Sequence, residues 1–293
     1  MLFRSTRLTY GFDHESQSLT DNSSDRSRDN TGIYLEVRQQ FDSGALTAGW
    51  RHDDNEDFGT RNSWRVSARH ALPGIARDWL VRAAIGTGFR APSLYEMAYN
   101  EGPFSYPPAS GAVLTEETSE GWEVGLVGSV GKLGVELIWF DQQIEDAIVF
   151  DLASYSGYIQ NPGTSTAEGL ELIANIPLSE NWSLEGNFTW LDATEQNGTD
   201  RPYRPEESGQ MSLLWSNSQW LTRLTAHHTG KAVDPFMVAI DETFTLDFTA
   251  RWAASARWSL EARILNLTDS TDQRLPGYYV PGITVYAGVR LSL

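Results

Sequence analysis

Alternation of apolar with polar residues, repeated in one segment after another, constrains the fold of this chain more than any other feature. Between Trp79 and Phe89, for example, bulky apolar side chains alternate with Arg82, Gly86 and Gly88. A period of two residues is that of a β-strand with one apolar and one polar face. Because the pattern recurs along most of the chain, it predicts a protein built almost entirely of strands.

The alternation and the turn residues between the alternating segments predict about 14 strands, with ends placed to within roughly two to four residues. Their ranges are 2–15, 30–41, 45–54, 61–71, 78–90, 118–129, 132–150, 158–177, 182–192, 206–216, 219–230, 242–253, 257–268 and 280–293. Pro92 ends the fifth of them.

The connections between the predicted strands fall into two alternating classes. Short ones lie at 42–44, 72–75, 129–131, 179–180, 217–218 and 254–255. Long ones, rich in Asp, Asn, Ser, Gly and Pro, lie at 17–30, 53–60, 90–118, 192–205, 231–241 and 269–279. An up-and-down meander has this pattern, with the short turns at one rim and the long loops at the other.

One face of each predicted strand is apolar, and the opposite face carries charges of both signs. Trp64, Val66 and Ala68, for instance, oppose Arg65 and Arg69. The other apolar sets include Ile33, Leu35 and Val37; Trp182, Leu184, Phe188 and Trp190; Phe244, Leu246, Phe248 and Trp252; and Trp258, Leu260, Ala262 and Ile264. Charges on the inner face suit a hydrated lumen, so the predicted fold class is all-β, an antiparallel up-and-down transmembrane β-barrel. A soluble sandwich with a polar outer face also alternates, but a regular meander of this length is unusual for a sandwich.

The composition is compatible with this fold. Among 293 residues there are 11 Trp, 11 Tyr and 12 Phe, which fits the aromatic girdles of a membrane barrel. The sequence has no run of 18 apolar residues that would predict a transmembrane helix. The absence of cysteine excludes a disulfide scaffold and thiolate metal sites. A net charge of −17 without a basic stripe disfavours nucleic-acid binding.

No motif predicts an enzyme, a metal site or a bound cofactor. His227 and His228 are adjacent on a predicted strand and therefore point to opposite faces. Neither an H-E-x-x-H nor a G-x-S-x-G motif occurs. The acidic run from Asp53 to Asp57 lacks the twelve-residue pattern of a calcium loop, and we interpret it as a solvated loop.

Several segments together resemble the barrel of TonB-dependent outer-membrane receptors. The first is Gly86-Thr-Gly-Phe-Arg-Ala-Pro-Ser-Leu-Tyr-Glu96, followed after a long polar loop by Thr115-Glu-Glu-Thr-Ser-Glu-Gly-Trp-Glu-Val-Gly125. Further matching segments, in the order in which that family has them, are Trp139–Ile148, Tyr158–Gly163, Ala167–Leu172, Trp182–Asp192, Arg201–Pro205, Arg263–Asp269 and Tyr278–Gly282. The ordered series, more than any single segment, carries the resemblance.

The resemblance implies a place in the outer membrane of a Gram-negative bacterium, in contact with outer-membrane lipid. It also implies the uptake of a scarce small ligand, such as a siderophore–iron chelate or cobalamin, energised through TonB. Barrels of plugged transporters have 22 strands. About 14 strands would therefore be the C-terminal part of such a barrel, over 1–293, without the plug that contacts TonB. Met1 to Tyr10 reads as a strand and not as a signal peptide.

Two positions depart from the family pattern. Ile283 stands where the family commonly has Arg after Pro-Gly. The segment Tyr286–Leu293 keeps the spacing of the signal for the barrel-assembly machinery but lacks its terminal aromatic residue.

The resemblance leaves individual ligand-binding residues open. The loop candidates are Arg90, Tyr95, Tyr106, Tyr203 and Tyr278. Arg90 and Glu96 are expected to form a solvated pair at the rim, and Glu116, Glu117 and Glu123 to be loop and lumen charges.

Two alternatives to active uptake remain. The strands can close into a smaller passive pore, or the chain can be a truncated half-barrel that transports nothing. In either case two strand edges, near 6–12 and 285–291, need partners, because unpaired backbone groups are costly in lipid.

Overall fold

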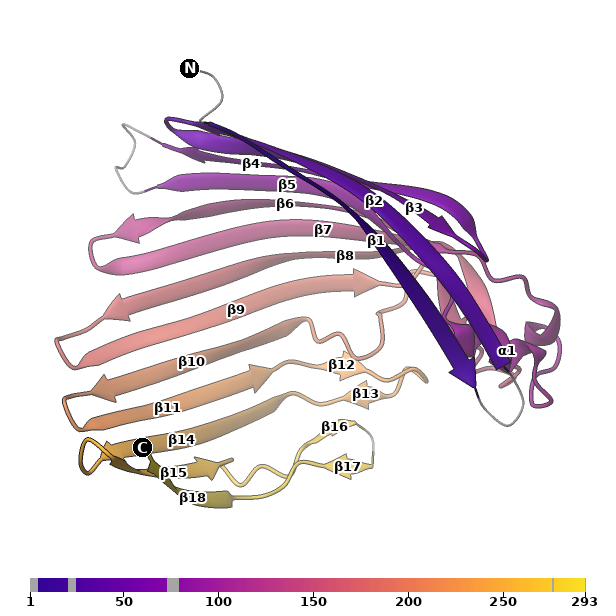
Figure 1. Cartoon of the computed structure of the whole chain (residues 1–293). Coiled ribbons are helices and arrows are strands. Elements are labelled where there is room, and N and C mark those ends of the chain that lie inside the picture. Colours follow the sequence, from indigo (N-terminus) through magenta and orange to yellow (C-terminus); the bar gives the residue numbers. More distant parts are fainter. Residues whose placement is uncertain (1–4, 21–24, 73–78, 276, 293) are drawn as a thin grey trace. The chain divides into compact units, whose positions relative to one another are not determined.

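The computed structural model describes residues 5–20, 25–72, 79–275 and 277–292, and it confirms a nearly all-β, antiparallel fold (Figure 1). One sheet has 14 strands in the order β1-β2-β3-β4-β5-β6-β7-β8-β9-β10-β11-β14-β15-β18. Their bounds are β1 Thr6–Thr20, β2 Asp25–Phe41, β3 Gly44–Asn55, β4 Gly59–Ala71, β5 Leu80–Arg90, β6 Glu117–Val130, β7 Leu133–Phe150, β8 Tyr158–Pro177, β9 Trp182–Thr194, β10 Glu207–Ser216, β11 Trp220–Thr229, β14 Thr243–Ala253, β15 Trp258–Leu265 and β18 Thr284–Leu291. Each predicted strand corresponds to one of these, so the meander is confirmed.

The remaining elements are short and lie in the connections. A helix, α1 Leu94–Glu101, and a 3₁₀ turn, η1 Ala109–Gly111, follow β5. Two small hairpins are β12 Ala232–Val233 with β13 Ala239–Ile240, and β16 Gln273–Leu275 with β17 Tyr278–Tyr279. Among the described residues, no helix has the length and apolar character that a membrane crossing requires.

The chain divides into two compact units. The first consists of Met1–Val124, Phe140–Ala167 and Thr194–Thr199. The second consists of Gly125–Trp139, Glu168–Ala193 and Asp200–Leu293.

In the first unit, the register of β1 to β5 places the predicted apolar side chains in rows across the sheet. One such row is Leu8, Val37, Ala48, Val66 and Ile85. Of these side chains, all but that of Ala48 are large, apolar and exposed. A continuous exposed apolar face is stable only against an apolar medium, as on the lipid side of a membrane barrel.

The opposite face of the first unit carries ion pairs. Arg51 reaches Asp13 at 2.7 Å and Asp53 at 2.6 Å. Gly32 lies between the two carboxylates in the register, and a Cβ atom there would lie 2.0 Å from the Arg51 guanidinium. Glycine therefore leaves the space through which the Arg51 side chain passes.

The second unit repeats the two-faced pattern. A row on its apolar face runs through Leu184, Leu213, Leu224, Phe248, Ile264 and Val285. Near the short turns, Trp182 contacts Trp215, with ring centroids 6.3 Å apart, and Trp220 stacks on Trp252 at 5.8 Å. These pairs form an aromatic band at the short-turn end of the unit, as in a membrane-interface girdle.

The predicted loop at 17–30 is wrong, because β1 runs to Thr20 and β2 begins at Asp25. Apart from Leu19, residues 14–20 and 25–30 are polar on both faces, so they show no alternation. Likewise, β3 extends to Asn55 and β4 begins at Gly59. A tight turn therefore stands in place of the long loop predicted at 53–60.

Other predicted bounds are also corrected. β15 ends at Leu265 and β18 begins at Thr284, later than the predicted start at 280. The first residues of the strand predicted at 2–15, most of the short connection at 72–75 and residue 293 lie outside the described residues.

Candidate ligand-binding site

Arg90, the last residue of β5, is the centre of an ion-pair network in the first unit. The network lies at the end of the strands where the long connections are. Its Nε and Nη2 donate to the two carboxylate oxygens of Glu117 at 2.7 and 2.8 Å. Its Nη1 donates to Glu96 at 3.1 Å. Glu117 also accepts a hydrogen bond from the backbone N–H of Ile148 at 2.6 Å. The network therefore joins the ends of β5, β6 and β7 to α1.

The predicted Arg90–Glu96 pair is confirmed, but its description as a solvated rim pair is incomplete. The side chains of Glu96 and Glu117 are only 12 % and 16 % exposed, whereas that of Arg90 is 44 % exposed. Glu117 thus has a structural role and is more than a loop charge. A two-point pair between a guanidinium and partly buried carboxylates fixes both geometry and position.

Glu116, also predicted to be a loop charge, is buried and paired. Both of its carboxylate oxygens accept hydrogen bonds from Arg61, at 2.8 and 2.9 Å. The Arg61 guanidinium therefore holds the pKa of the Glu116 carboxyl below its ordinary value. Glu123 lies on β6, with its carboxylate 3.6 Å from Arg65, which agrees with the prediction of a charge on the polar face.

The long loop predicted at 90–118 is corrected, because it contains α1. Ser93 caps the helix: its Oγ accepts from the N–H of Glu96 at 3.2 Å, and Glu96 accepts from the N–H of Ser93 at 2.6 Å. This reciprocal pair is a capping box. Glu96 therefore both starts the helix and binds Arg90.

An aromatic cluster lies where α1 meets the β7–β8 connection. The Tyr158 ring lies edge-on to those of Tyr99 and Phe150, with centroids 5.7 and 5.3 Å away. Tyr95 lies 6.2 Å from Tyr158, and its side chain is half exposed. Exposed aromatic faces on a fixed support can stack against a ring-containing ligand.

Asn100 holds this cluster in place. Its amide donates to the carbonyl of Tyr158 at 2.7 Å and accepts from the N–H of Tyr158 at 2.8 Å. Asn100 is buried, so both bonds are shielded from water. Gly157 leaves room for it, because a Cβ atom there would lie 2.6 Å from the Asn100 side-chain oxygen.

The β7–β8 connection is itself hydrogen-bonded to the segment after α1. Asp151 accepts from the N–H of Ala153 at 3.0 Å and from the hydroxyl of Ser156 at 2.8 Å, and the Ser154 hydroxyl also donates to it. These donors, Ser154 first and Ser156 next, lower the pKa of the Asp151 carboxyl to about 2. The Tyr106 hydroxyl donates to the carbonyl of Ser154.

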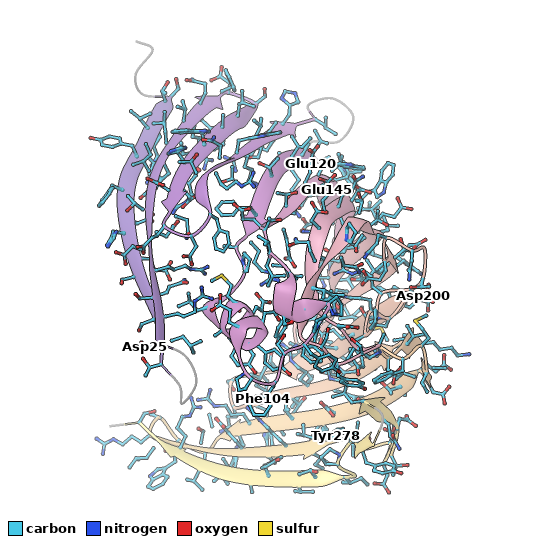
Figure 2. The ribbon with its side chains drawn as sticks, turned by 90° about the vertical axis from the view of Figure 1, so that its right-hand side faces the viewer. Asp25, Phe104, Glu120, Glu145, Asp200 and Tyr278 are labelled. Atoms are coloured by element: carbon cyan, nitrogen blue, oxygen red, sulfur yellow. The ribbon has the colours of Figure 1, made fainter. Side chains whose placement is uncertain are left out.

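A hydrogen bond from β2 also reaches the segment just before α1. Arg28, which is buried, donates to the carbonyl of Pro92 at 2.6 Å and to Gln17 at 2.9 Å, and lies 5.6 Å from the ring centre of Phe58. The segment continues past α1 to the exposed Phe104, which Figure 2 shows beside the short helices. We call residues 93–106 and 150–158, with Arg90 and Glu117, the α1 platform.

The structure brings three of the five candidate residues into the α1 platform. Arg90 and Tyr95 are linked through Glu96, and Tyr106 binds the β7–β8 connection. Tyr203 and Tyr278 belong to the second unit. Tyr203 donates its N–H to Val233 at 2.8 Å, and Tyr278 is an exposed residue of β17.

The second unit has a groove of its own, of about 1090 Å³, which includes the start of the β12–β13 hairpin. Apolar side chains such as Leu137, Trp139 and Trp190 line it together with Arg204 and Lys231. Its carboxylates are Glu168, Asp192, Asp200, Glu206 and Glu207. Tyr203, one of the candidate residues, directly precedes Arg204, which lines this groove.

Sequence reasoning missed Ser93, Asn100, Glu117 and the aromatic partners of Tyr95. The Ser93-x-x-Glu96 spacing is a recognisable capping-box signal. Asn100 carries no comparable signal, because its role depends on a contact with a residue 58 positions away. In the described ranges, no group of three or more His, Asp or Glu side chains is arranged to hold a metal ion.

The chain is similar to known proteins over most of its length. A family model described as "TonB dependent receptor-like, beta-barrel" matches residues 3–267. The vitamin B12 transporter BtuB of Photobacterium profundum is 25 % identical over 269 residues, which are 89 % of this chain and 42 % of that protein.

Solved structures share the fold. The siderophore receptor PirA from Pseudomonas aeruginosa matches with a TM-score of 0.76 and 23 % identity, over 98 % of this chain and 53 % of that one. A mutant of the ferric enterobactin receptor PfeA from the same species, in complex with enterobactin, matches with a TM-score of 0.81 and 20 % identity, over 98 % and 51 %. The chain thus spans about half the length of the proteins it matches.

The ordered strands, the two-faced sheet and the family match over 3–267 lead to one conclusion. This chain belongs to the TonB-dependent receptor-like β-barrel family, whose members are outer-membrane proteins of Gram-negative bacteria.

Proposed function

We propose that this chain is part of a receptor barrel that takes up a scarce ligand of the cobalamin or ferric siderophore class, with energy supplied through TonB. The observation that carries the proposal is the α1 platform. A loop that only connects two strands needs neither a capped helix nor a two-point ion pair at its base. Fixed aromatic and polar groups at the long-segment rim are what a receptor needs to hold a ligand before uptake.

The charged side chains at the α1 platform are paired with one another, which favours an uncharged ligand. Between Arg90 and the start of β6, residues 91–116 contain Glu96, Glu101 and Glu116 and no Lys or Arg. The Arg90 guanidinium is already bound to two carboxylates. Glu101 and Glu116 are themselves paired, with Arg26 at 3.3 Å and Arg61 at 2.8 Å, so arginines balance the carboxylates here. Cyanocobalamin is uncharged and offers a flat ring system for the exposed aromatic side chains. The relative from P. profundum is named a vitamin B12 transporter.

We further propose that the chain supplies the C-terminal part of the barrel, over 1–293, and that a plug outside it makes the contact with TonB. The apolar face would contact outer-membrane lipid, and β18 would be the segment presented to the barrel-assembly machinery. We propose binding and transport, and no enzymatic reaction, since the relatives are named as receptors and transporters.

Uptake of labelled cyanocobalamin tests the proposal. The chain is expressed behind a generic signal peptide in a strain without its own cobalamin receptor, either alone or joined to the plug and first barrel strands of a relative. We expect saturable uptake from the joined protein that disappears when TonB is removed, and none from the chain alone.

Two other results would contradict the proposal. TonB-independent, unsaturable leakage through the chain alone would indicate a passive pore. TonB-dependent uptake by the chain alone would show that the domain content proposed here is wrong.

A joined protein with Tyr95→Ala and Tyr99→Ala should take up less ligand at low concentration, whereas Tyr10→Ala, on the apolar face, is the matched control.

A further inference from the structure

Four arginines meet at one small cavity on the polar face of the first unit. Arg38 of β2, Arg65 and Arg69 of β4 and Arg82 of β5 line a cavity of about 270 Å³. Glu123 of β6 is the single carboxylate among its lining residues. We call this site the arginine cavity. An excess of positive charge in one place is notable in a chain whose net charge is −17.

The register of the sheet places like charges directly opposite one another at this site. Arg69 pairs with Arg82 across β4 and β5, and Arg7 pairs with Arg38 across β1 and β2. Like charges in directly opposed positions destabilise a sheet. Positions where a chain departs from such a rule are often sites that serve function and not stability.

Two arginines of the arginine cavity, Arg65 and Arg69, make longer contacts than other arginines in the same unit. Arg51, Arg61 and Arg90 approach carboxylates at 2.6 to 2.8 Å. By contrast, Arg65 lies 3.6 Å from Glu123, and Arg69 donates to the Gln40 side chain at 3.4 Å. A guanidinium has five N–H donors, so these two side chains retain donors for another acceptor.

The floor of the arginine cavity is made of small residues. Ala45 and Ala84 are buried beneath the arginines. The volume corresponds to about nine water molecules, at roughly 30 Å³ each. A phosphate or a small carboxylate fits this space, whereas a ligand as large as cobalamin does not.

We propose that the arginine cavity binds a small oxyanion, either phosphate or a polycarboxylate. The forked guanidinium matches the geometry of both groups, and several converging arginines neutralise more than one negative charge. The site lies near the short-turn end of the strands, away from the α1 platform, since Arg69 and Arg82 are each two residues from the ends of β4 and β5 that face the 72–79 connection. The inference does not depend on the ligand proposed for uptake.

Calorimetric titration of the full chain in detergent micelles tests this inference. Inorganic phosphate and citrate are added separately at constant ionic strength, and thermal unfolding is followed in parallel. We expect saturable binding of one anion per chain and a midpoint of unfolding that rises with anion concentration, because the folded state binds the anion. Preference for one anion identifies which oxyanion the site takes.

Substitutions make the test specific. Arg69→Gln with Arg82→Gln should weaken binding at least tenfold and abolish the anion-dependent rise in the midpoint. Arg257→Gln, an exposed arginine at a short turn of the second unit, should leave binding unchanged.

Three results would overturn the inference. One is the absence of saturable binding of both anions. Another is equal weakening in the Arg257→Gln variant. The third is an anion-dependent midpoint that rises equally in the double variant, which would mean general ionic screening.

Discussion

Arg90 and Glu117 form a two-point ion pair across 27 positions of sequence, with nitrogen–oxygen distances of 2.7 and 2.8 Å. The pair joins the last residue of β5 to the first residue of β6, at the base of the segment that contains α1. The α1 platform therefore stands on a fixed support and not on a free loop.

Replacing Arg90 with Gln should lower the free energy of unfolding by about 1–2 kcal/mol, a value reduced from that of a buried charged hydrogen bond because Arg90 is partly exposed. The main effect should be local, since Glu96 and Glu117 lose their shared partner. Limited proteolysis of the folded protein should cut residues 91–116 faster, with Arg257→Gln as the control. Equal cleavage rates in the two variants would show that the pair does not hold the segment.

A second prediction concerns the apolar face. Ile264 lies in the row with Phe248 and Val285, and it pairs with Phe248 at the middle of β14. Ile264→Arg should cost about 2–4 kcal/mol of stability in a lipid bilayer, as should Val66→Arg in the first unit. Glu261→Gln should be milder, because Glu261 lies on the polar face with Arg290 at 3.3 Å. Equal costs at Ile264 and Glu261 in bilayer unfolding experiments would favour a soluble, two-sided sheet.

The strand pattern could be predicted from sequence because alternation reports contact with lipid on one face. Where strands extend beyond that contact, the signal disappears. Asp25 to Asn30 is polar on both faces, and its place in β2 could not be read from alternation. The hairpins β12–β13 and β16–β17 could not be predicted either, because their strands are too short to show an alternation of apolar and polar residues.

The candidate site was only partly predictable. Arg90 and Glu96 are only six positions apart in sequence, which made their pairing predictable. Glu117 joins them only because the antiparallel meander returns the chain to the same rim. The Asn100–Tyr158 contact depends on how α1 packs, which no local pattern reports.

A third prediction concerns the stability of the β7–β8 connection at low pH. The pKa of Asp151 is about 2, below its ordinary value of 3.8, because the Ser154 and Ser156 groups donate to the carboxylate. A carboxyl group with a lowered folded-state pKa contributes stability that is fully present above its ordinary value and is lost as the pH falls through the folded value. The β7–β8 connection should therefore lose protection between pH 4 and about 2.

Proteolysis with an acid-active protease or hydrogen exchange across this range would measure the effect. Asp151→Asn should be less protected at neutral pH and nearly independent of pH between 4 and 2. Asp241→Asn, in another connecting segment, should behave as the unsubstituted chain does. A pH response in the Asp151→Asn variant as large as that of the original chain would assign the effect to other groups.

The most direct test of the account is the orientation of the sheet in the membrane, since a receptor must place its long segments outside the cell. Cysteines introduced singly at Ser110 and Gly198 lie in long segments, whereas those at Asp42 and Gly131 lie at short turns. With an impermeant thiol reagent on whole cells, Ser110→Cys and Gly198→Cys should react, and Asp42→Cys and Gly131→Cys should react only after the outer membrane is opened. The reverse labelling, or labelling of all four positions in intact cells, would contradict the account.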